Sequence, residues 1–286
     1  MASRTRSVLA GLGGAVLATA AVGAPVAPAQ GAAWAPADTA TIHPGVQMYT
    51  DGAQCTGNFV FTDGAGDVYV GYAAHCAGTG GATETNGCDA GSLPLGTKVD
   101  FVEGGSLVSD GDTVGTGTLV YSSWPAMQQA GTTDTNACDY NDFALVKVDA
   151  AYVDDVNPSI PFWGGPVGID TDGSQAGETV YSYGSSSLRA GVELLSPKQG
   201  TSLGTSGEGW SYSVYTATPG VPGDSGSAFL DSDGNALGTL STLAIAPLAG
   251  SNGVADLTHE LEFAQAHSGI SGLALAPGTE PFSPAL

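Results

Sequence analysis

The chain has 286 residues, of which 28 are Asp or Glu and 6 are Lys or Arg, so its formal net charge at pH 7 is −22. Such a surface repels phosphate backbones and anionic lipid headgroups, which argues against nucleic-acid or membrane partners. Hydrophobic residues make up 42% of the chain and 44 residues are Gly. This composition permits a sizeable core but disfavours helical bundles and coiled coils, because Gly is costly inside helices.

Residues 1–29 have the parts of a secretory signal. The basic stretch Met1–Arg6 precedes an apolar stretch, Ser7–Gly23, and the Ala-Pro-Ala sequence at 27–29 provides a small-x-small cleavage site. The alternative, a transmembrane anchor, is disfavoured by nearby glycines and prolines and by the lack of a stop-transfer charge. We therefore expect a secreted, extracellular protein with a short N-terminal segment at residues 30–44.

The β-type runs of the remaining chain are short and are separated by turn signals such as Asp63-Gly64 and Asp233-Gly234. This pattern is typical of an all-β barrel or sandwich. The runs are Asn58–Thr62, Val68–Tyr72, Val99–Val102, Gly117–Ser122, Phe143–Val148, Thr179–Tyr183, Ser211–Thr216, Ala228–Leu230 and Ala236–Leu240.

A proline-rich connection over Val156–Gly168 divides the chain into two β-rich parts, which we place at residues 45–160 and 161–275. The second part ends in the one stretch with a helical period, Asp256–His267, which Asp256 can cap and Gly269 can terminate. Residues 276–286 are rich in proline, and we expect a solvated tail there.

Four cysteines follow the leader: Cys55, Cys76, Cys88 and Cys138. None forms a Cys-x-x-Cys pair and none has a histidine at zinc-finger spacing, so we expect no metal site. An even number of cysteines in an exported chain predicts two disulfides, and counting alone leaves three connectivities open.

Three short segments carry residues suited to nucleophilic catalysis. His75 directly follows the predicted strand Val68–Tyr72, Asp142 precedes an apolar strand, and Ser225 lies in the sequence Gly223-Asp-Ser-Gly. A serine hydroxyl needs a neighbouring imidazole to take its proton, and a carboxylate can fix the tautomer of that imidazole. The N–H groups of Gly223 and Ser225 are the natural donors to a developing oxyanion.

Each segment has a plainer explanation when it is taken alone. His75 could be a packed or solvent-facing histidine, Asp142 could accept a turn hydrogen bond, and Gly-Asp-Ser-Gly could be an ordinary turn. Their joint occurrence in the order His, Asp, Ser on an exported, two-part β chain favours a catalytic triad.

With these three motifs, the chain resembles the chymotrypsin-like serine peptidases, and its composition and leader are most similar to the secreted actinobacterial members. The resemblance implies an all-β fold of two antiparallel Greek-key six-stranded β-barrels with a short C-terminal helix. It also implies a secreted serine endopeptidase that works through an acyl-enzyme, acts on protein or peptide substrates as a monomer, and uses no cofactor.

The same resemblance places four substrate-binding residues. Pro219 occupies the base of the specificity pocket, Ser241 belongs with Leu240 to the strand that binds the substrate backbone, Leu243 lies at the pocket entrance, and Gly253 leaves the back of the pocket open. Because Pro219 carries no charge, the bottom of the pocket cannot pair with a positively charged P1 side chain. We therefore expect cleavage after small or medium apolar P1 residues.

The resemblance further implies that Cys55 pairs with Cys76 and Cys88 with Cys138. It implies that the carboxylate of Asp224 is buried, so that it needs a positive or hydrogen-bonding partner. Arg189, the single arginine after the leader, is one candidate, and a freed N-terminal amine is another. Arg189 could equally be a solvated surface residue.

Two other functions remain open at this point. A non-catalytic binding module could use the same scaffold, because folds can keep surfaces and lose chemistry. An esterase could use the same triad, although Gly-Asp-Ser-Gly differs from the Gly-x-Ser-x-Gly elbow of α/β-hydrolases. The aspartate-rich stretches Asp170–Gly173 and Asp231–Asn235 could begin calcium loops, but hairpin turns explain them more simply.

Overall fold

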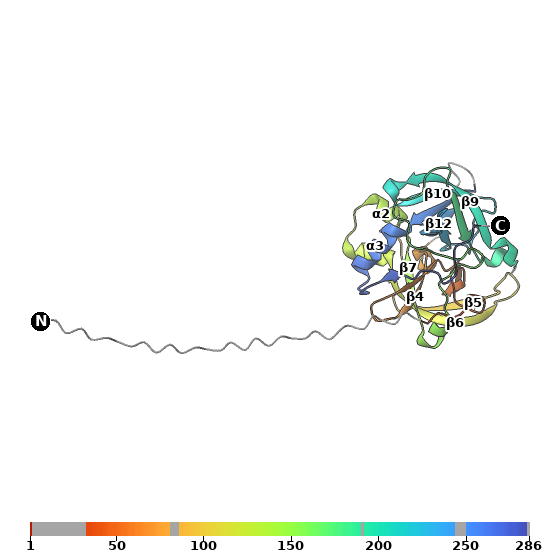
Figure 1. Ribbon diagram of the computed structural model, residues 1–286, viewed down its shortest axis with the longest axis horizontal. Coiled ribbons are helices and arrows are strands. Elements are labelled where there is room, and N and C mark those ends of the chain that lie inside the picture. Colours follow the sequence, from red (N-terminus) through yellow and green to blue (C-terminus); the bar gives the residue numbers. More distant parts are fainter. Residues whose placement is uncertain (2–32, 81–85, 190–191, 244–249, 285–286) are drawn as a thin grey trace. The chain divides into compact units, whose positions relative to one another are not determined.

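The computed structural model describes Met1 and residues 33–284, except for residues 81–85, 190–191 and 244–249. The chain divides into residues 1–30 and residues 31–286, and only the second unit is described further (Figure 1). The secretory signal expected at residues 1–29 thus lies outside the described residues, apart from Met1. No helix in the described part of the chain is long and apolar enough to cross a membrane.

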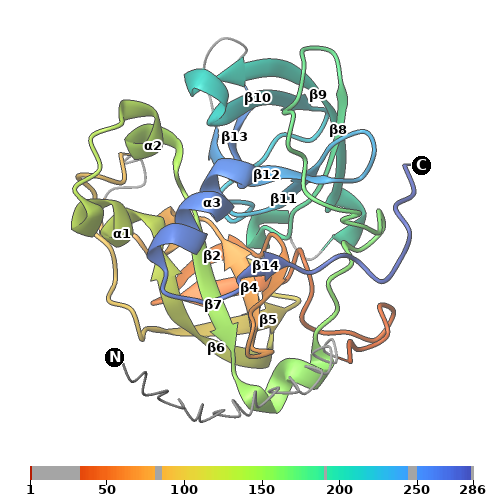
Figure 2. The ribbon, with the colours of Figure 1, turned by 60° about the vertical axis from the view of Figure 1, so that its left-hand side comes forward.

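In the described residues, seven strands from the first half of the chain and β14 from its C-terminal end form an antiparallel sheet in the order β14-β3-β4-β7-β6-β5-β1-β2. Figure 2 shows β14 on the same side of the molecule as β4 and β5, far from the barrel strands β9 and β10. We expected a closed six-stranded barrel here, whereas this sheet has eight strands and ends at β14 and β2, because β14 pairs with β3. The strands are β1 (Gln47–Thr50), β2 (Ala53–Thr56), β3 (Val60–Thr62), β4 (Val68–Tyr72), β5 (Lys98–Glu103), β6 (Asp112–Ser122), β7 (Ala144–Val148) and β14 (Ala274–Leu275).

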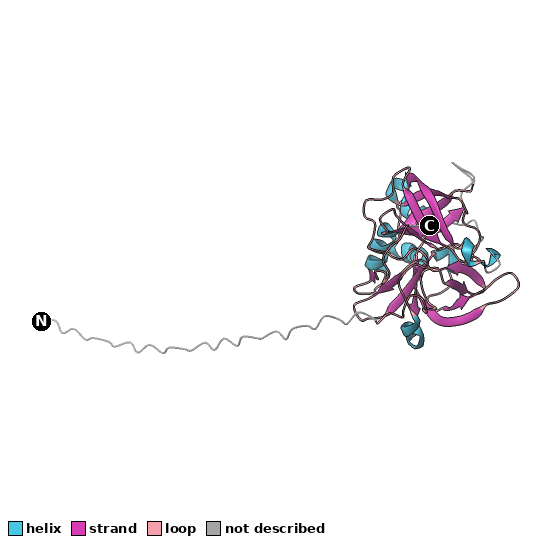
Figure 3. Cartoon of the chain, turned by 45° about the vertical axis from the view of Figure 1, so that its right-hand side comes forward, coloured by secondary structure: helices cyan, strands magenta, loops and turns pink. Residues whose placement is uncertain are grey.

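The second half forms a closed antiparallel barrel of six strands in the order β10-β13-β12-β11-β8-β9, which confirms one of the two expected barrels. Strands make up most of the described secondary structure (magenta in Figure 3). In β10, Tyr212 and Val214 are buried in the barrel core while Tyr215 is exposed, as the period of two requires. The strands are β8 (Thr179–Tyr183), β9 (Pro197–Ser206), β10 (Ser211–Thr216), β11 (Ala228–Leu230), β12 (Ala236–Leu243) and β13 (Asn252–Asp256).

The described residues also contain three α-helices: α1 (Ser123–Ala130), α2 (Thr135–Tyr140) and α3 (Leu257–His267). The expected C-terminal helix is confirmed as α3, and Asp256 caps it by accepting a hydrogen bond from the backbone N–H of His259 at 2.8 Å. Helix α3 packs against β12, β13 and α1 (Figure 2).

One hydrophobic cluster joins the two halves of the chain. It contains Phe143 from the first half, Trp163 and Leu230 from the second, and Leu257 and Leu261 of α3. All five side chains are nearly or fully buried. A shared core of this kind fixes the loops of both halves relative to one another, because close packing leaves little freedom for sliding.

Most described residues of the C-terminal segment are exposed, but the segment is tied to the fold at several points. The backbone N–H of Ala276 donates to the carbonyl of Val60 at 2.9 Å, and that of Ser283 donates to the carbonyl of Trp163 at 2.8 Å. The Phe282 ring lies 5.3 Å from the Tyr181 ring, centroid to centroid. The segment is therefore solvent-exposed and also held against residues that are distant in sequence.

Candidate active site

His75 lies in a single 3-10 turn, Ala74–Ala77, that directly follows the fully buried strand β4. The next residue, Cys76, forms a disulfide with Cys55 of β2, which ties this turn to the sheet edge. The second disulfide joins Cys88 to Cys138, so both pairings are those that the family resemblance implies. The His75 side chain remains 25% exposed and is therefore accessible from outside.

Asp142 lies just before β7 and holds His75 by two hydrogen bonds. Its Oδ2 atom lies 2.7 Å from Nδ1 of His75, and its Oδ1 atom accepts the backbone N–H of His75 at 2.8 Å. The hydroxyl of Ser241 donates to Oδ2 at 2.6 Å. The Asp142 side chain is only 5% exposed, so these contacts fix it in a largely dry environment.

Two opposing effects act on the imidazole of His75. Burial lowers the pKa of His75, but the negative charge of Asp142 and its hydrogen bond raise that pKa by more. The net result is a pKa above the ordinary value of 6.5. A histidine in this setting is a stronger base than a free imidazole, with its Nε2 atom left to act.

The loop that carries Ser225 packs against the strands that precede His75. The carbonyl of Ser225 accepts the backbone N–H of Thr56 at 2.8 Å, and the N–H of Gly226 donates to the carbonyl of Leu240 at 2.7 Å. A Cβ atom at Gly226 would lie 2.4 Å from the Thr56 carbonyl oxygen and 3.0 Å from the backbone nitrogen of Ala73. Only glycine allows this close approach, which brings the serine loop to the end of β4.

Among the hydrogen bonds of the described residues, none joins the Ser225 hydroxyl to His75. The structure thus brings Asp142 into direct contact with both His75 and Ser241. The backbone of the Ser225 loop contacts Thr56 and Leu240, which are the chain neighbours of Cys55 and Ser241. Hydrogen bonds of catalytic serines are often long without substrate and tighten when substrate binds.

The two backbone N–H groups expected to hold an oxyanion are free of acceptors in the described part of the chain. Gly223 has a φ of +95°, a left-handed conformation that favours glycine. Its carbonyl accepts from the Thr56 hydroxyl at 2.8 Å and from the Gln54 amide at 3.0 Å. With that carbonyl held by the first half of the chain, the N–H groups of Gly223 and Ser225 remain available to a ligand.

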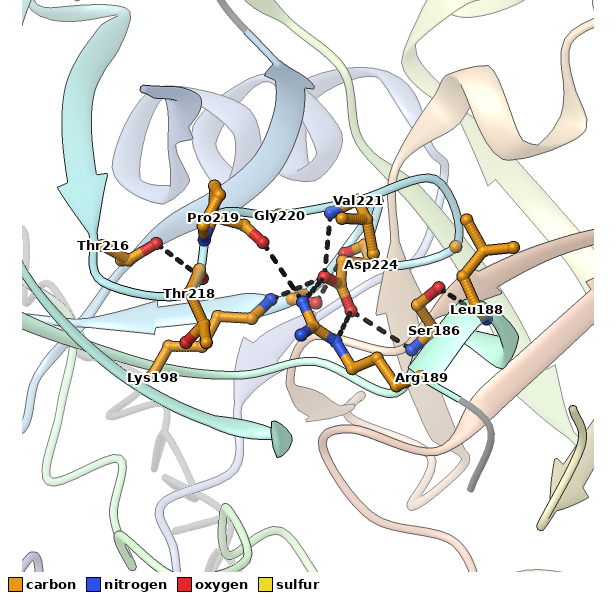
Figure 4. A network of polar contacts seen from close by, with 12 residues as sticks. Ser186, Leu188, Arg189, Lys198, Thr216, Thr218, Pro219, Gly220, Val221 and Asp224 are labelled. Carbon is orange, nitrogen blue, oxygen red and sulfur yellow. Dashed lines mark hydrogen bonds and ion pairs between the residues drawn. The ribbon is translucent and has the colours of Figure 1, made fainter. Parts of the chain in front are cut away.

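Asp224, whose side chain is fully buried, receives two cations (Figure 4). An Arg189 guanidinium nitrogen lies 2.5 Å from Oδ2, and the Lys198 ammonium lies 2.8 Å from the same oxygen. The N–H groups of Ser186 and Val221 also donate to the carboxylate, at 3.1 and 3.0 Å. The candidate pairing of Asp224 with Arg189 is therefore present, and the N-terminal amine is not required as a partner.

These contacts decide the ionisation of Asp224. Burial raises the pKa of its carboxyl, but the charges of Lys198 and Arg189 and their hydrogen bonds lower it by more, so the pKa lies below the ordinary value. Lys198 itself was missed by sequence reasoning, because lysine is ordinarily a surface residue. One signal could have found it: Lys198 is one of only four cationic residues after the leader.

The expected pocket residues lie in two places. Ser241 and Gly253 line a cavity of about 340 Å³ together with Asp139, Tyr140, Ser211, Thr242 and Ala255. Pro219 does not line this cavity, and its carbonyl accepts a hydrogen bond from Arg189 at 3.2 Å. The side chain of Leu243 lies outside the described residues, so its expected place at the pocket entrance is not addressed by the structure.

Metal binding has little support in the described residues. The only group with three suitable ligand atoms close together is Cys55, His75 and Cys76, and its two sulfur atoms are joined as a disulfide. In the aspartate-rich turn, the Asp231 carboxylate accepts the N–H groups of Asp233 and Asn235, each at 2.8 Å. The Asp231 carboxylate thus accepts hydrogen bonds from the backbone of its own turn, as expected for a hairpin.

No protein-family model matches the chain, and no curated protein matches it. Among solved structures, the chain is similar to Thermobifida fusca protease A, with 18% identity, a TM-score of 0.49, and coverage of 83% of this chain and 99% of that chain. It is similar to Nocardiopsis protease at 17% identity and a TM-score of 0.47, covering 82% and 98%. It is also similar to Cellulomonas bogoriensis chymotrypsin at 18% identity and a TM-score of 0.48, covering 82% and 98%. At these identities, what the chain does has to follow from its own side chains.

Proposed function

We propose that the chain is an exported serine endopeptidase of the chymotrypsin-like type, with the two Greek-key halves of that fold and the active site between them. The observation that carries this proposal is the contact of His75 with Asp142, whose carboxylate also accepts the Ser241 hydroxyl, beside a serine loop with two free N–H groups. Nucleophile, base, orienting acid and oxyanion donors are thereby all accounted for.

The reaction follows from these positions. Nε2 of His75 takes the proton of the Ser225 hydroxyl as its oxygen attacks the carbonyl carbon of the scissile peptide bond. The N–H groups of Gly223 and Ser225 hold the oxyanion, while Asp142 stabilises the imidazolium. The imidazolium then gives its proton to the leaving amine, and the C–N bond breaks to leave an acyl-enzyme. Water, deprotonated by His75, attacks the ester, and the acid product departs as Ser225 regains its proton.

The internal pairing of Asp224 bears on activation. Because Arg189 and Lys198 already neutralise this carboxylate, the adjacent oxyanion loop is held without a new N-terminal amine. We infer that removal of the leader leaves an active enzyme and that residues 30–44 have no part in activation. The two disulfides agree with an extracellular protein, since such bonds persist in oxidising environments.

The substrate preference we propose is for small or medium apolar P1 residues. The carbonyl of Pro219 is engaged by Arg189, and the N–H of Gly220 donates to the Asn252 side chain at 3.0 Å. No carboxylate contacts either residue among the described side chains, so a basic P1 side chain would lack a partner for its charge. This part of the proposal rests on the family resemblance of Pro219 as the pocket base.

The proposal is tested with the protein lacking its leader and a library of unstructured peptides, with Ser225→Ala as the matched variant. We expect cleavage after apolar residues by the natural chain, and a loss of turnover of about 10⁶-fold in the variant, as other triads show. Cleavage of esters without peptides would favour the esterase alternative. The absence of both activities would favour the binding module, and a strong preference for Arg or Lys would refute the assigned specificity.

A further inference from the structure

Helix α3 carries a carboxyl group that the proposed reaction does not use. Glu260 is completely buried. Its Oε2 atom accepts the Thr239 hydroxyl at 2.7 Å, and its Oε1 atom accepts the backbone N–H of Asp142 at 3.2 Å. A buried carboxyl normally sits beside a cation. No lysine or arginine contacts Glu260 in the described part of the chain.

The ionisable groups around Glu260 are acids rather than bases. The charges of Asp142 and Asp256 act on it, and the pKa of the Tyr121 phenol is raised first by burial and then by the charge of Glu260. Burial, helped by the charges of Asp142 and Asp256, raises the pKa of Glu260 well above its ordinary value, against the opposing hydrogen bonds of Thr239 and Asp142. A neutral carboxyl is therefore the form that fits this site.

The contacts of Glu260 extend into a chain of buried polar groups. The Asn58 side-chain amide donates to the Thr239 hydroxyl at 3.1 Å, and its oxygen accepts the N–H of Phe59 at 2.6 Å. Asn58, Thr239 and Glu260 are each fully buried. The chain thus runs from the approach to β3, through β12 and α3, to the backbone of Asp142, and it crosses between the two halves of the molecule.

We propose that Glu260 is a positioning residue for Asp142. Thr239 orients the Glu260 carboxyl, which holds the backbone N–H of Asp142 just before β7. This contact keeps the Asp142 carboxylate directed at Nδ1 of His75. The same carboxylate is reached from β12 by Ser241, so α3 fixes its backbone while β12 fixes its side chain. The catalytic meaning of this inference rests on the proposed function, but the geometry at His75 does not.

Two variants of Glu260 separate its role as an acceptor from its role as a buried side chain. In Glu260→Gln the amide oxygen can still accept the Asp142 N–H, whereas Glu260→Met fills a similar volume with no such acceptor. Leu261→Ala is the matched control, because Leu261 is the next residue of α3 and is buried in the shared apolar core. It should lower stability through a cavity and leave the polar chain intact.

The first readout is the imidazole pKa of His75 and the resonance of its Nδ1 proton, both measured by NMR without substrate. We expect Glu260→Met to lower this pKa toward the ordinary value, because the Asp142 carboxylate, which raises it, is no longer held against Nδ1. It should lower kcat about tenfold with little change in KM. Glu260→Gln should leave the His75 pKa unchanged and keep kcat within about twofold of the natural chain. Leu261→Ala should reduce stability and leave the His75 pKa unchanged.

Several results would overturn the positioning role. One is an unchanged His75 pKa and kcat in Glu260→Met. Another is a loss of His75 pKa and kcat in Glu260→Gln that is as large as the loss in Glu260→Met. If Glu260→Met does not fold, Thr239→Val removes the hydroxyl that orients Oε2 at nearly constant volume, and an unchanged His75 pKa in that variant overturns the proposal equally. A natural chain with no peptidase activity but the expected pKa changes would overturn the proposed function alone.

Discussion

The Ser241 hydroxyl donates a 2.6 Å hydrogen bond to Oδ2 of Asp142, the same oxygen that lies 2.7 Å from Nδ1 of His75. Sequence reasoning assigned Ser241 only to the binding of substrate backbone. The structure adds that its side chain stabilises the charge of the acid that orients the histidine. A residue of β12, which we expect to bind the substrate backbone, therefore takes part in the polar network of the candidate active site.

Replacing Ser241 with Ala should lower kcat/KM about tenfold to a hundredfold, because one hydrogen bond to a buried charged group is lost and such bonds contribute about 1.5–3 kcal/mol. Steady-state kinetics on a peptide substrate measure the effect. Ser232→Ala, which removes a hydroxyl from an exposed turn, is the matched control and should change kcat/KM by less than twofold. Equal effects of the two variants would show that the bond to Asp142 contributes nothing to the reaction.

The pairing of Asp224 with Lys198 can be tested by a double-mutant cycle. Lys198→Met should lower the free energy of unfolding by about 3–5 kcal/mol, since a buried carboxylate loses a partner. In the Lys198→Met background, Asp224→Asn should cost less than it does alone, because the carboxylate then has Arg189 as its remaining cation. Urea unfolding measures each variant. Lys147→Met, which breaks a half-exposed pair with Asp67, should cost less than about 1 kcal/mol.

Losses that simply add in the Lys198→Met and Asp224→Asn double variant would contradict the pairing. Activity should fall together with stability in Lys198→Met, because Asp224 adjoins the oxyanion loop. By contrast, trimming residues 33–41 should leave activity nearly unchanged, since no N-terminal amine is needed to neutralise Asp224.

The pH dependence of kcat/KM should reflect the raised pKa of His75. The base must be neutral to accept the Ser225 proton, so kcat/KM should rise with pH through a midpoint above 6.5. Stability changes with pH in the opposite direction to kcat/KM. The His75–Asp142 pair stabilises the fold fully below pH 6.5, and this contribution is lost as the pH rises through the folded-state pKa of His75. In Asp142→Asn the midpoint should move to lower pH, and a midpoint that stays in place would contradict the assignment of this limb to His75.

The burial of Glu260 predicts a second pH effect on stability. With a folded-state pKa well above the ordinary 4.5, Glu260 weakens the fold increasingly as pH rises from 4.5 to that pKa, because the unfolded chain ionises first. Glu260→Gln should therefore raise the free energy of unfolding at pH 7, because the amide has no charge to keep out of water. This gain should vanish below pH 4.5. Urea unfolding at several pH values measures it, and an equal difference at all pH values would contradict the buried neutral carboxyl.

The sequence predicts best those features that are local. Val68–Tyr72 and Thr179–Tyr183 were expected as strands with the bounds that they have, because β-branched and aromatic residues are concentrated there. Strand β9, Pro197–Ser206, was missed because Gly, Ser and Thr dominate it and only its pairing with β8 and β10 makes it a strand. Helix α2, with six residues, is too short to show a helical period.

The candidate site divides in the same way. His75, Asp142 and Ser225 belong to motifs that can be recognised in sequence, and the structure joins the first two by a direct contact. Arg189 was named in advance as a candidate partner of Asp224, and the structure contains that pair. Lys198 and Glu260 were not named, because they meet Asp224 and Asp142 only through tertiary packing. Their residue types alone point to the surface.

The central claim is that Ser225 is a nucleophile activated by His75, and covalent labelling tests it most directly. The protein without its leader is treated with a fluorophosphonate, and the modified residue is identified by peptide mass spectrometry, with His75→Ala and Ser225→Ala treated in parallel. The account predicts modification of Ser225 alone in the natural chain, labelling slowed by at least about 10³-fold in His75→Ala, and none in Ser225→Ala. An unmodified Ser225, or labelling that proceeds at the same rate without His75, would contradict it.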